Sequence, residues 1–342
     1  MFRSDPQNTG RSKWLNQISG QISSLNNSYE IETSLSIGSN ALIYFTTADK
    51  KHFCIDTTGN TVWKADLAID GGRAPYSPVI LNDGTILAAD IKYLYAFSNS
   101  GIEKWRLQYN FLAIPTINIG KDGTIYIIGD FSTLLAVSLN GSLLWKLEEQ
   151  NAGWRNATAI SADGNTLYLS GDKLYALNLL ERKIKWKTTF QGIYPMTDVD
   201  GNVYCFSVSN TDSSSLFSLD DSGDVNWEFR FKDFVSELAM DKDGNIYFGA
   251  VNVYSVNYNG KLKWKKDNIN NWQPLLCDEK NNLYSIYFQG TGLSVWCISE
   301  SGNVVWNAFN ENLKYNRCYG SALGFNKLIT PSWENSKLYI IR

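Results

Sequence analysis

Short apolar runs alternate with glycine-containing polar turns along almost the whole chain, and this pattern predicts an all-β protein. An Asp-Gly pair between apolar runs is a strong signal for a tight hairpin turn. Such pairs occur at Asp83-Gly84, Asp122-Gly123, Asp163-Gly164, Asp200-Gly201 and Asp243-Gly244. No segment shows a convincing helical apolar period with caps, so we expect short strands throughout.

A tryptophan recurs at intervals of about forty residues, which is typical of a repeat architecture. Most of these tryptophans end the same phrase, as in Gly59-Asn-Thr-Val-Trp63, and only Trp186 has an arginine, Arg182, in place of the glycine. A phrase such as Leu94-Tyr95-Ala96-Phe97 lies upstream of each tryptophan. Because glycine tolerates positive φ, each glycine is predicted to form the turn between the two strands.

The upstream phrase occurs eight times, in the registers of residues 53, 95, 135, 175, 217, 254, 296 and 339. Four short strands in about forty residues, repeated along the chain, predict a β-propeller. We therefore expect a single domain, residues 1–342, with eight four-stranded antiparallel blades. Segment 1–20, around Trp14, is predicted to supply the outer strand of the last blade and to close the ring. Seven blades remain the alternative.

The phrases Asp-Gly-Thr-x-Tyr, Leu-Tyr-Ala-Leu and Gly-x-x-x-Trp together resemble the repeats of the pyrroloquinoline-quinone-type (PQQ-like) propeller family, over essentially all of the chain. The resemblance implies that the tryptophans dock between neighbouring blades. Large quinoprotein dehydrogenases of this type have a longer chain, a calcium site and often a vicinal cysteine pair. This chain has no such pair, so we expect neither PQQ nor calcium. The docking residues expected are Trp14, Trp63, Trp105, Trp145, Trp186, Trp227, Trp264 and Trp306.

Charge and cysteine content exclude some classes of function. The net charge of −3 leaves no basic footprint, so we expect no nucleic-acid binding.

No apolar run reaches the roughly 18–20 residues that span a bilayer. No signal peptide is recognisable, and we expect a cytoplasmic protein; an extracytoplasmic one is the alternative if the chain is processed or trimmed. Of the five cysteines, four are expected as buried small side chains and Cys318 in a loop.

Residues able to do acid–base or metal chemistry are sparse. The one histidine, His52, begins a strand phrase, where we expect it to be solvated. A Ser–His–Asp triad and a histidine-rich metal site are therefore not expected. The aspartates before glycine are interpreted as turn residues, and so is the densest acidic run, Asp220 to Asp224.

The loops that follow the tryptophan strands hold the candidate binding residues. In propellers such loops reach the mouth of the central channel, where ligands commonly bind. Arginines there would suit anionic groups, and aromatic side chains would serve as rigid anchors. The candidates are Arg73, Tyr76, Phe111, Trp154, Arg155, Tyr194, Phe234, Trp272, Tyr315 and Arg317.

The leading hypothesis is a non-catalytic scaffold that binds a protein or peptide partner through these channel-mouth loops. An enzyme or a binder of small molecules, such as a sugar or peptide, is the alternative, and a quinone-dependent dehydrogenase is a third. The sequence leaves open the identity of the partner, the face that is functional and the oligomeric state.

Overall fold

A computed structural model gives the fold of the chain, and strands are its only regular elements in the described residues, with no helix among them. The structure describes residues 17–68, 77–109, 117–129, 132–150, 152–154, 157–208, 213–235, 237–249, 251–269, 274–289, 292–311, 320–332 and 337–342.

The strands form eight antiparallel sheets of four strands each, and these sheets are the blades of an eight-bladed β-propeller. The prediction of eight blades is confirmed, and the seven-bladed alternative is wrong. The chain divides into two compact units with four sheets each. The first unit includes Ser12–Ala113 and Leu276–Arg342, and the second includes Ile114–Leu275. Whether they behave as the single domain predicted from the sequence stays a prediction.

In the first unit, three sheets follow the chain in order and the fourth combines strands from both of its ends. The strands are β2 (Ser36–Ile37), β3 (Ile43–Thr46), β4 (Lys51–Ile55) and β5 (Thr61–Asp66); β6 (Val79–Ile80), β7 (Ile86–Ala89), β8 (Tyr93–Phe97) and β9 (Glu103–Gln108); β26 (Leu276–Cys277), β27 (Leu283–Gln289), β28 (Gly292–Ile298) and β29 (Val304–Asn310); and β30 (Ala322–Gly324), β31 (Lys327–Ser332), β32 (Lys337–Ile341) and β1 (Ile22–Ser28).

In the second unit, all four sheets follow the chain in order. The strands are β10 (Asn118–Ile119), β11 (Ile125–Gly129), β12 (Thr133–Val137) and β13 (Leu143–Glu148); β14 (Thr158–Ile160), β15 (Thr166–Ser170), β16 (Leu174–Asn178) and β17 (Lys183–Lys187); β18 (Ile193–Thr197), β19 (Val203–Val208), β20 (Ser214–Leu219) and β21 (Val225–Phe231); and β22 (Ala239–Met240), β23 (Ile246–Gly249), β24 (Val253–Val256) and β25 (Leu262–Lys266).

In most sheets the two middle strands are largely buried on both faces, whereas the fourth strand alternates between exposed and half-buried positions. Strands β11 and β12 are buried at every residue, and β13 alternates over most of its length. A small residue stands opposite the tryptophan of the fourth strand, as Ala136 does for Trp145 and Cys297 for Trp306. Four cysteines are buried and free, Cys54, Cys205, Cys277 and Cys297, as predicted; Cys318 lies outside the described residues.

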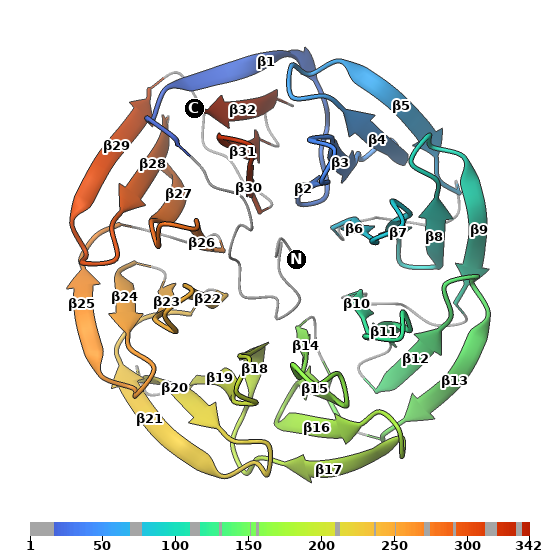
Figure 1. The fold of residues 1–342 in the computed structure, drawn as a ribbon, viewed down its shortest axis with the longest axis vertical. Helices are drawn as coiled ribbons and strands as arrows, with labels where there is room; N and C mark the ends of the chain where they lie inside the picture. The colour runs from blue at the N-terminus through green and yellow to red at the C-terminus, as the bar shows by residue number, and fades with distance from the viewer. Residues whose placement is uncertain are drawn as a thin grey trace. The chain divides into compact units, whose positions relative to one another are not determined.

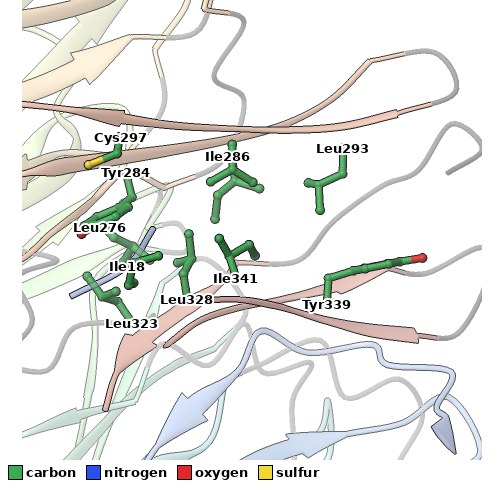
Figure 2. Packing of buried hydrophobic residues seen from close by; sticks show 11 residues of the cluster. Ile18, Leu276, Tyr284, Ile286, Leu293, Cys297, Leu323, Leu328, Tyr339 and Ile341 are labelled. Carbon is green, nitrogen blue, oxygen red and sulfur yellow. The ribbon is translucent and has the colours of Figure 1, made fainter. Parts of the chain in front are cut away.

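Apolar side chains from adjacent sheets form the core between them. In the first unit, Tyr284, Ile286 and Leu293 of one sheet pack with Leu328 and Ile341 of the next (Figure 2). Corresponding clusters join the other adjacent sheets within each unit. Burial of apolar area between sheets, rather than within one sheet, therefore stabilises each unit.

Four tryptophans of the fourth strands make the same two contacts with a neighbouring segment. In three cases that segment is the hairpin turn of the next sheet. Trp63 Nε1 donates to the carbonyl oxygen of Asn99 at 2.9 Å, and a Cβ built on Gly101 would lie 2.5 Å from Trp63 Cδ2. Trp186 pairs with Asp221 and Gly223, and Trp227 with Tyr258 and Gly260, in the same way.

We call this pair of groups the indole site: a glycine with positive φ and the carbonyl oxygen two residues before it. Gly101 has φ of 82°, and its missing side chain leaves room for the indole face. Where Arg182 replaces the glycine, its φ is still positive at 59°, and its guanidinium lies 5.5 Å from the ring centroid of Trp145. A cation over an indole is favourable, so the exception keeps the contact by other means.

The sheet made from both chain ends has its fourth strand, β1, beside β32 (Figure 1). Ile22 pairs with Ile341, and Gln21 and Arg342 exchange two backbone hydrogen bonds of 3.0 Å. Closure by an N-terminal strand is thus confirmed, but the strand is Ile22–Ser28 rather than part of segment 1–20. No hairpin joins β32 to β1. The spacing between the upstream phrase and the tryptophan strand, which holds in the other sheets, therefore does not apply to this sheet. Trp14 lies outside the described residues.

The N-terminal segment before β1 builds an indole site without a hairpin. Trp306 Nε1 donates to the carbonyl oxygen of Ile18 at 2.8 Å. A Cβ on Gly20, whose φ is 88°, would lie 2.9 Å from Trp306 Cε3. Ile18 and Gly20 therefore have the spacing that Asn99 and Gly101 have in a turn.

Strand β1 has no tryptophan, and two other side chains fill the indole site that it faces. Leu25 lies where the indole would be, because a Cβ on Gly59 would meet Leu25 Cδ1 at 3.1 Å. Lys327 Nζ donates to the carbonyl oxygen of Thr57 at 3.4 Å, in place of an indole N–H. At the other sites one tryptophan supplies both the apolar contact and the N–H donor. Here Leu25 supplies the apolar contact and Lys327 supplies the donor.

Candidate interaction surface

The structure describes three of the predicted binding residues, Trp154, Tyr194 and Phe234, and all three belong to the second unit. The other seven lie outside the described residues, and their roles stay predictions: Arg73, Tyr76, Phe111, Arg155, Trp272, Tyr315 and Arg317.

Trp154 follows the β13 strand and is fully buried. Its ring packs edge-on against Tyr175, with centroids 6.1 Å apart. The loop approaches Gly171 closely, since a Cβ there would lie 2.8 Å from the carbonyl oxygen of Gly153. The indole N–H is buried without a hydrogen-bond partner, which is costly and uncommon in a folded protein. Trp154 thus anchors its loop to the core.

Tyr194 lies at the start of β18, close behind Gly192, which pairs with Gly171. Gly171 N donates to the carbonyl oxygen of Gly192 at 3.2 Å, and the two residues form an isolated antiparallel bridge. Tyr194 is half-buried and has φ of 53°. Burial, and then the nearby charge of Glu237, raise the pKa of its hydroxyl. The side chain is therefore a neutral hydrogen-bonding group at physiological pH.

Phe234, in the loop between β21 and β22, has 64% of its side chain exposed. The neighbouring Asp233 holds this loop in place. Its carboxylate accepts from the backbone N–H groups of Phe234 at 2.8 Å and Asn252 at 2.8 Å, and from Asn252 Nδ2 at 2.9 Å. Val235 packs against the same apolar cluster as Tyr194.

These contacts connect the three loops into one strip, which we call the loop strip: Ala152–Trp154, Gly171, Gly192–Tyr194 and Asp233–Val235. Along it, a buried indole fixes one end, a half-buried hydroxyl lies in the middle and an exposed phenyl ring stands at the other end. An exposed aromatic ring on a rigid loop loses little entropy on binding, so it suits an anchor in a protein interface.

Sequence reasoning missed Asp233, Gly171 and Gly192, which organise the strip through backbone contacts. Gly192 has a recognisable reason to be glycine, because a Cβ there would lie 2.4 Å from Leu174 Cβ. A glycine inside a strand pattern is the available signal for such close backbone approach. Nothing in the sequence around Asp233 distinguishes it from an ordinary loop aspartate.

His52 corrects an expectation from the sequence, because it is fully buried rather than solvated. Its Nδ1 lies 3.0 Å from Thr46 Oγ1, and its ring stacks on Phe97. Burial lowers its pKa to about 3, so the imidazole is neutral near neutral pH. Strand β4 is covered on both faces, so alternation along the strand gives no solvated position here. A neutral imidazole with no exposed surface is a poor candidate for a general base.

The aspartates before glycine are turn residues, as predicted. Asp83 and Asp122 each accept from the backbone N–H of the threonine two residues on, at 2.9 Å. In other turns the organiser is a buried aspartate two residues earlier, which the sequence interpretation missed. Asp198 accepts from Asn202 Nδ2 at 2.7 Å and from the Tyr204 hydroxyl at 2.8 Å. In the acidic run, Asp220 accepts from the backbone N–H groups of Ser222 and Asp224.

Two further features, a metal-binding cluster and a membrane-spanning helix, are absent from the described residues. No group of three or more histidine, cysteine, aspartate or glutamate side chains in the described ranges is placed to hold a metal ion. Within the same ranges, no helix is long and apolar enough to cross a membrane.

Comparisons with known proteins agree with this fold. The family model described as outer membrane protein assembly factor BamB matches residues 5–220 and 130–312. BamB from Moraxella catarrhalis is similar over 94% of this chain and 97% of that chain, with 14% identity and a TM-score of 0.66. No curated protein matches.

Two lyases are also similar in structure. Streptogramin B lyase matches over 94% of this chain and 97% of that chain, with 10% identity and a TM-score of 0.58. A catalytically inactive virginiamycin B lyase from Staphylococcus aureus, with quinupristin, matches over 94% of this chain and 98% of that chain, with 11% identity and a TM-score of 0.59. At such identities these likenesses show the fold alone.

Proposed function

Because this chain belongs to the family of outer membrane protein assembly factor BamB, we propose that it is a non-catalytic scaffold that binds a protein or peptide partner. The partner is held by the loops that follow the tryptophan strands, and the loop strip of the second unit is the described part of that surface. The name of the family points to an assembly role, which suits a protein partner.

The observation that carries the proposal is the exposed Phe234 on its fixed loop. Four hydrogen bonds to the Asp233 carboxylate hold the loop: from the N–H groups of Phe234, Val251 and Asn252 and from Asn252 Nδ2. Ser214 Oγ donates to the Asp233 carbonyl oxygen at 2.9 Å. A large aromatic side chain held 64% exposed on a loop fixed by such a network suits a rigid anchor for a partner.

The test is affinity capture of partners from native lysate, with wild-type protein and Phe234→Ala compared by quantitative mass spectrometry. Removing an aromatic anchor typically costs about 2 kcal/mol or more, which is at least a tenfold loss of affinity. We expect the specific partner to fall in recovery accordingly. Asp233→Ala, which leaves the ring but loosens its loop, should give a smaller loss.

The matched control is Leu180→Ala. Leu180 is also an exposed apolar residue of the second unit, at 87% exposure, but it lies in the β16–β17 turn, outside the loop strip. The control should capture the partner as the wild type does. Equal recovery by Phe234→Ala and wild type, with both proteins folded, would remove the loop strip from the interface.

A small-molecule binder or enzyme is the second candidate, since the same fold occurs in two lyases. Against acid–base catalysis by histidine stands the burial of His52, the one histidine of the chain. Thermal-shift measurements with sugars, peptides and quinupristin test this candidate. Stabilisation that grows with ligand concentration would favour it over the scaffold.

Compartment and cofactor use remain part of the proposal. We propose a cytoplasmic protein without PQQ or calcium, on the free cysteines and the missing vicinal cysteine pair. Cell fractionation tests the compartment. The absorbance spectrum after addition of PQQ and calcium tests the cofactor, because retained quinone absorbance after desalting would contradict the proposal.

A further inference from the structure

One fourth strand lacks the charge that all the other tryptophan strands carry. Six of the seven tryptophans are followed directly by a charged residue: Lys64, Arg106, Lys146, Lys187, Glu228 and Lys265. Trp306 is followed by Asn307, and the whole of β29, Val-Val-Trp-Asn-Ala-Phe-Asn, is uncharged.

Charge on these strands has a physical use. A fourth strand pairs with its sheet along one side only, and its other side presents unpaired backbone groups to which a foreign strand can bind. Charged side chains discourage that pairing. On β21, for example, Arg230 and Glu228 form an ion pair of 2.8 Å along the strand. Strand β29 has no such protection.

The exposed side of β29 is apolar as well as uncharged. Val305 is 56% exposed and Phe309 52% exposed, and Asn307 between them is also exposed. Trp306 and Ala308 alternate with them and are half-buried. Val305, Asn307 and Phe309 therefore share one face of the strand.

Strand β29 is also regular enough to accept a partner strand. Its register shifts once, between Cys297 and Ile298, which leaves Val305 as the extra residue of a bulge at the start of the strand. The pairing from Trp306 to Asn310 follows β28 without a break. Among the described residues, no strand pairs with its other side. Strand β1 is uncharged too, but its register shifts between Ser24 and Ser28, which disrupts a regular edge.

We propose that β29 pairs antiparallel with β29 of a second copy of this chain, with the two-fold axis at Asn307. That register places Val305 of each copy opposite Phe309 of the other, and Asn307 opposite Asn307. Aromatic and β-branched side chains are favourable cross-strand partners. The interface is self-complementary, as a two-fold dimer requires. The same pairing of β25, Leu-Lys-Trp-Lys-Lys, would bring lysines together.

The test is sedimentation velocity of the full chain over a wide range of protein concentration, with wild type and Asn307→Lys. The wild type should dimerise as concentration rises. In Asn307→Lys the two new ammonium groups meet at the axis, and we expect dimerisation to weaken at least tenfold. The fold should tolerate the change, because Lys146 and Lys265 hold the equivalent position on β13 and β25. Circular dichroism and the melting temperature check this.

Two further variants test whether the loss of dimerisation is specific to a charge at position 307. Val225→Lys adds the same charge to an exposed position of β21 and should dimerise like the wild type. Asn307→Glu alone should be monomeric, as Glu228 shows that the position accepts glutamate. An equimolar mixture of Asn307→Lys and Asn307→Glu should regain the dimer, since opposite charges then meet at the axis.

A wild type that stays monomeric at all concentrations overturns the proposal, and so does an Asn307→Lys variant that dimerises like the wild type. A mixture of the two charge variants that stays monomeric excludes the register centred on Asn307. Partner capture through Phe234 is independent of all these results, because Phe234 lies in the β21–β22 loop of the second unit, whereas β29 belongs to the first.

Discussion

Indole sites made by a hairpin turn and the site made by the N-terminal segment use the same two groups. Asn99 and Gly101 are held by the β8–β9 turn, whose two strands are joined covalently. Ile18 and Gly20 are held by contacts with residues distant in sequence. Gln17 N donates to Asn326 Oδ1 at 3.0 Å, Ser19 Oγ donates to the carbonyl oxygen of Arg342 at 2.9 Å, and β1 pairs with β32. A turn therefore keeps its indole site by local chain geometry, whereas the N-terminal segment keeps it by hydrogen bonds between residues distant in sequence.

The comparison shows which groups are required to bind the indole. A carbonyl oxygen, a glycine two residues later and positive φ are sufficient, whatever chain connection supplies them. At Gly59 the same site accepts Leu25 and Lys327 together in place of an indole. That these contacts hold neighbouring sheets together is the docking role predicted from the sequence, and stability measurements on truncated and substituted chains can test it.

Removing β1 should have the largest effect. A chain lacking residues 1–28 loses the fourth strand of its sheet, the Ile18–Gly20 site and the buried Leu25, whose apolar contribution alone is about 2–5 kcal/mol. We expect the first unit to unfold at much lower urea concentration than in the full chain. A chain lacking only residues 1–16 is the control. An equal loss in the control would mean that the segment around Trp14, rather than β1, holds the chain end.

Trp306→Ala should come next, with a loss of about 3–5 kcal/mol in the free energy of unfolding, as for other large core truncations. The indole loses its bond to Ile18 and its contact with Tyr284, whose ring centroid lies 6.0 Å away. Trp63→Ala makes the same change at a turn-built site. Urea unfolding of both variants compares the two kinds of site. Losses below about 1 kcal/mol in both would reject the docking role of the tryptophans.

Alanine at the glycine of each site should cost less. Gly101→Ala forces a non-glycine residue into positive φ, at about 1–2 kcal/mol, and adds a clash at 2.5 Å with Trp63. Gly20→Ala also requires positive φ, but its Cβ meets Trp306 at the longer distance of 2.9 Å. We expect the loss at Gly101 to exceed that at Gly20 in thermal unfolding. The reverse order would show that the N-terminal segment is held more rigidly than a turn.

Lys327→Met should have the smallest effect, within about 1 kcal/mol, since it removes one hydrogen bond and one partly buried charge. Burial and the charge of Arg342 lower the pKa of Lys327 below its ordinary 10.5. Between the two values the unfolded chain binds more protons than the folded one, so stability rises with pH there. The wild type should therefore gain stability relative to Lys327→Met as pH rises toward 10.5. A constant difference across that range would contradict the shift.

Much of the fold follows from the sequence because its signals are local. Asp-Gly turns, a glycine before six of the seven repeated tryptophans and a phrase repeated eight times define four-stranded units wherever the strands are consecutive. The strand from the N-terminus has no turn to mark it, and its residues, Ile-Ser-Ser-Leu-Asn-Asn-Ser, carry a weak pattern. Its partner is more than three hundred residues away in the sequence. Local patterns could therefore predict that closure occurs, but not by which residues.

The candidate site was harder to predict because burial depends on neighbouring sheets. Trp154 and Phe234 have the same place in the repeat, after a tryptophan strand, yet one is fully buried and the other 64% exposed. The prediction for His52 was wrong for the same reason, since its environment is made by Phe97 of the next sheet. Asp233 became visible only once its hydrogen-bond partners, distant in sequence, were placed around it.

The pairing of Gln21 with Arg342 also bears on how such a protein can be rebuilt. Gln21 and Arg342 lie beside each other on adjacent strands, so a short linker could join these two residues, and the chain could instead be opened at one of its hairpins. The new ends would then present a glycine and a carbonyl oxygen with the spacing that Ile18 and Gly20 already show to be sufficient without a covalent turn. The order in which the blades are synthesised is therefore separable from the structure they form.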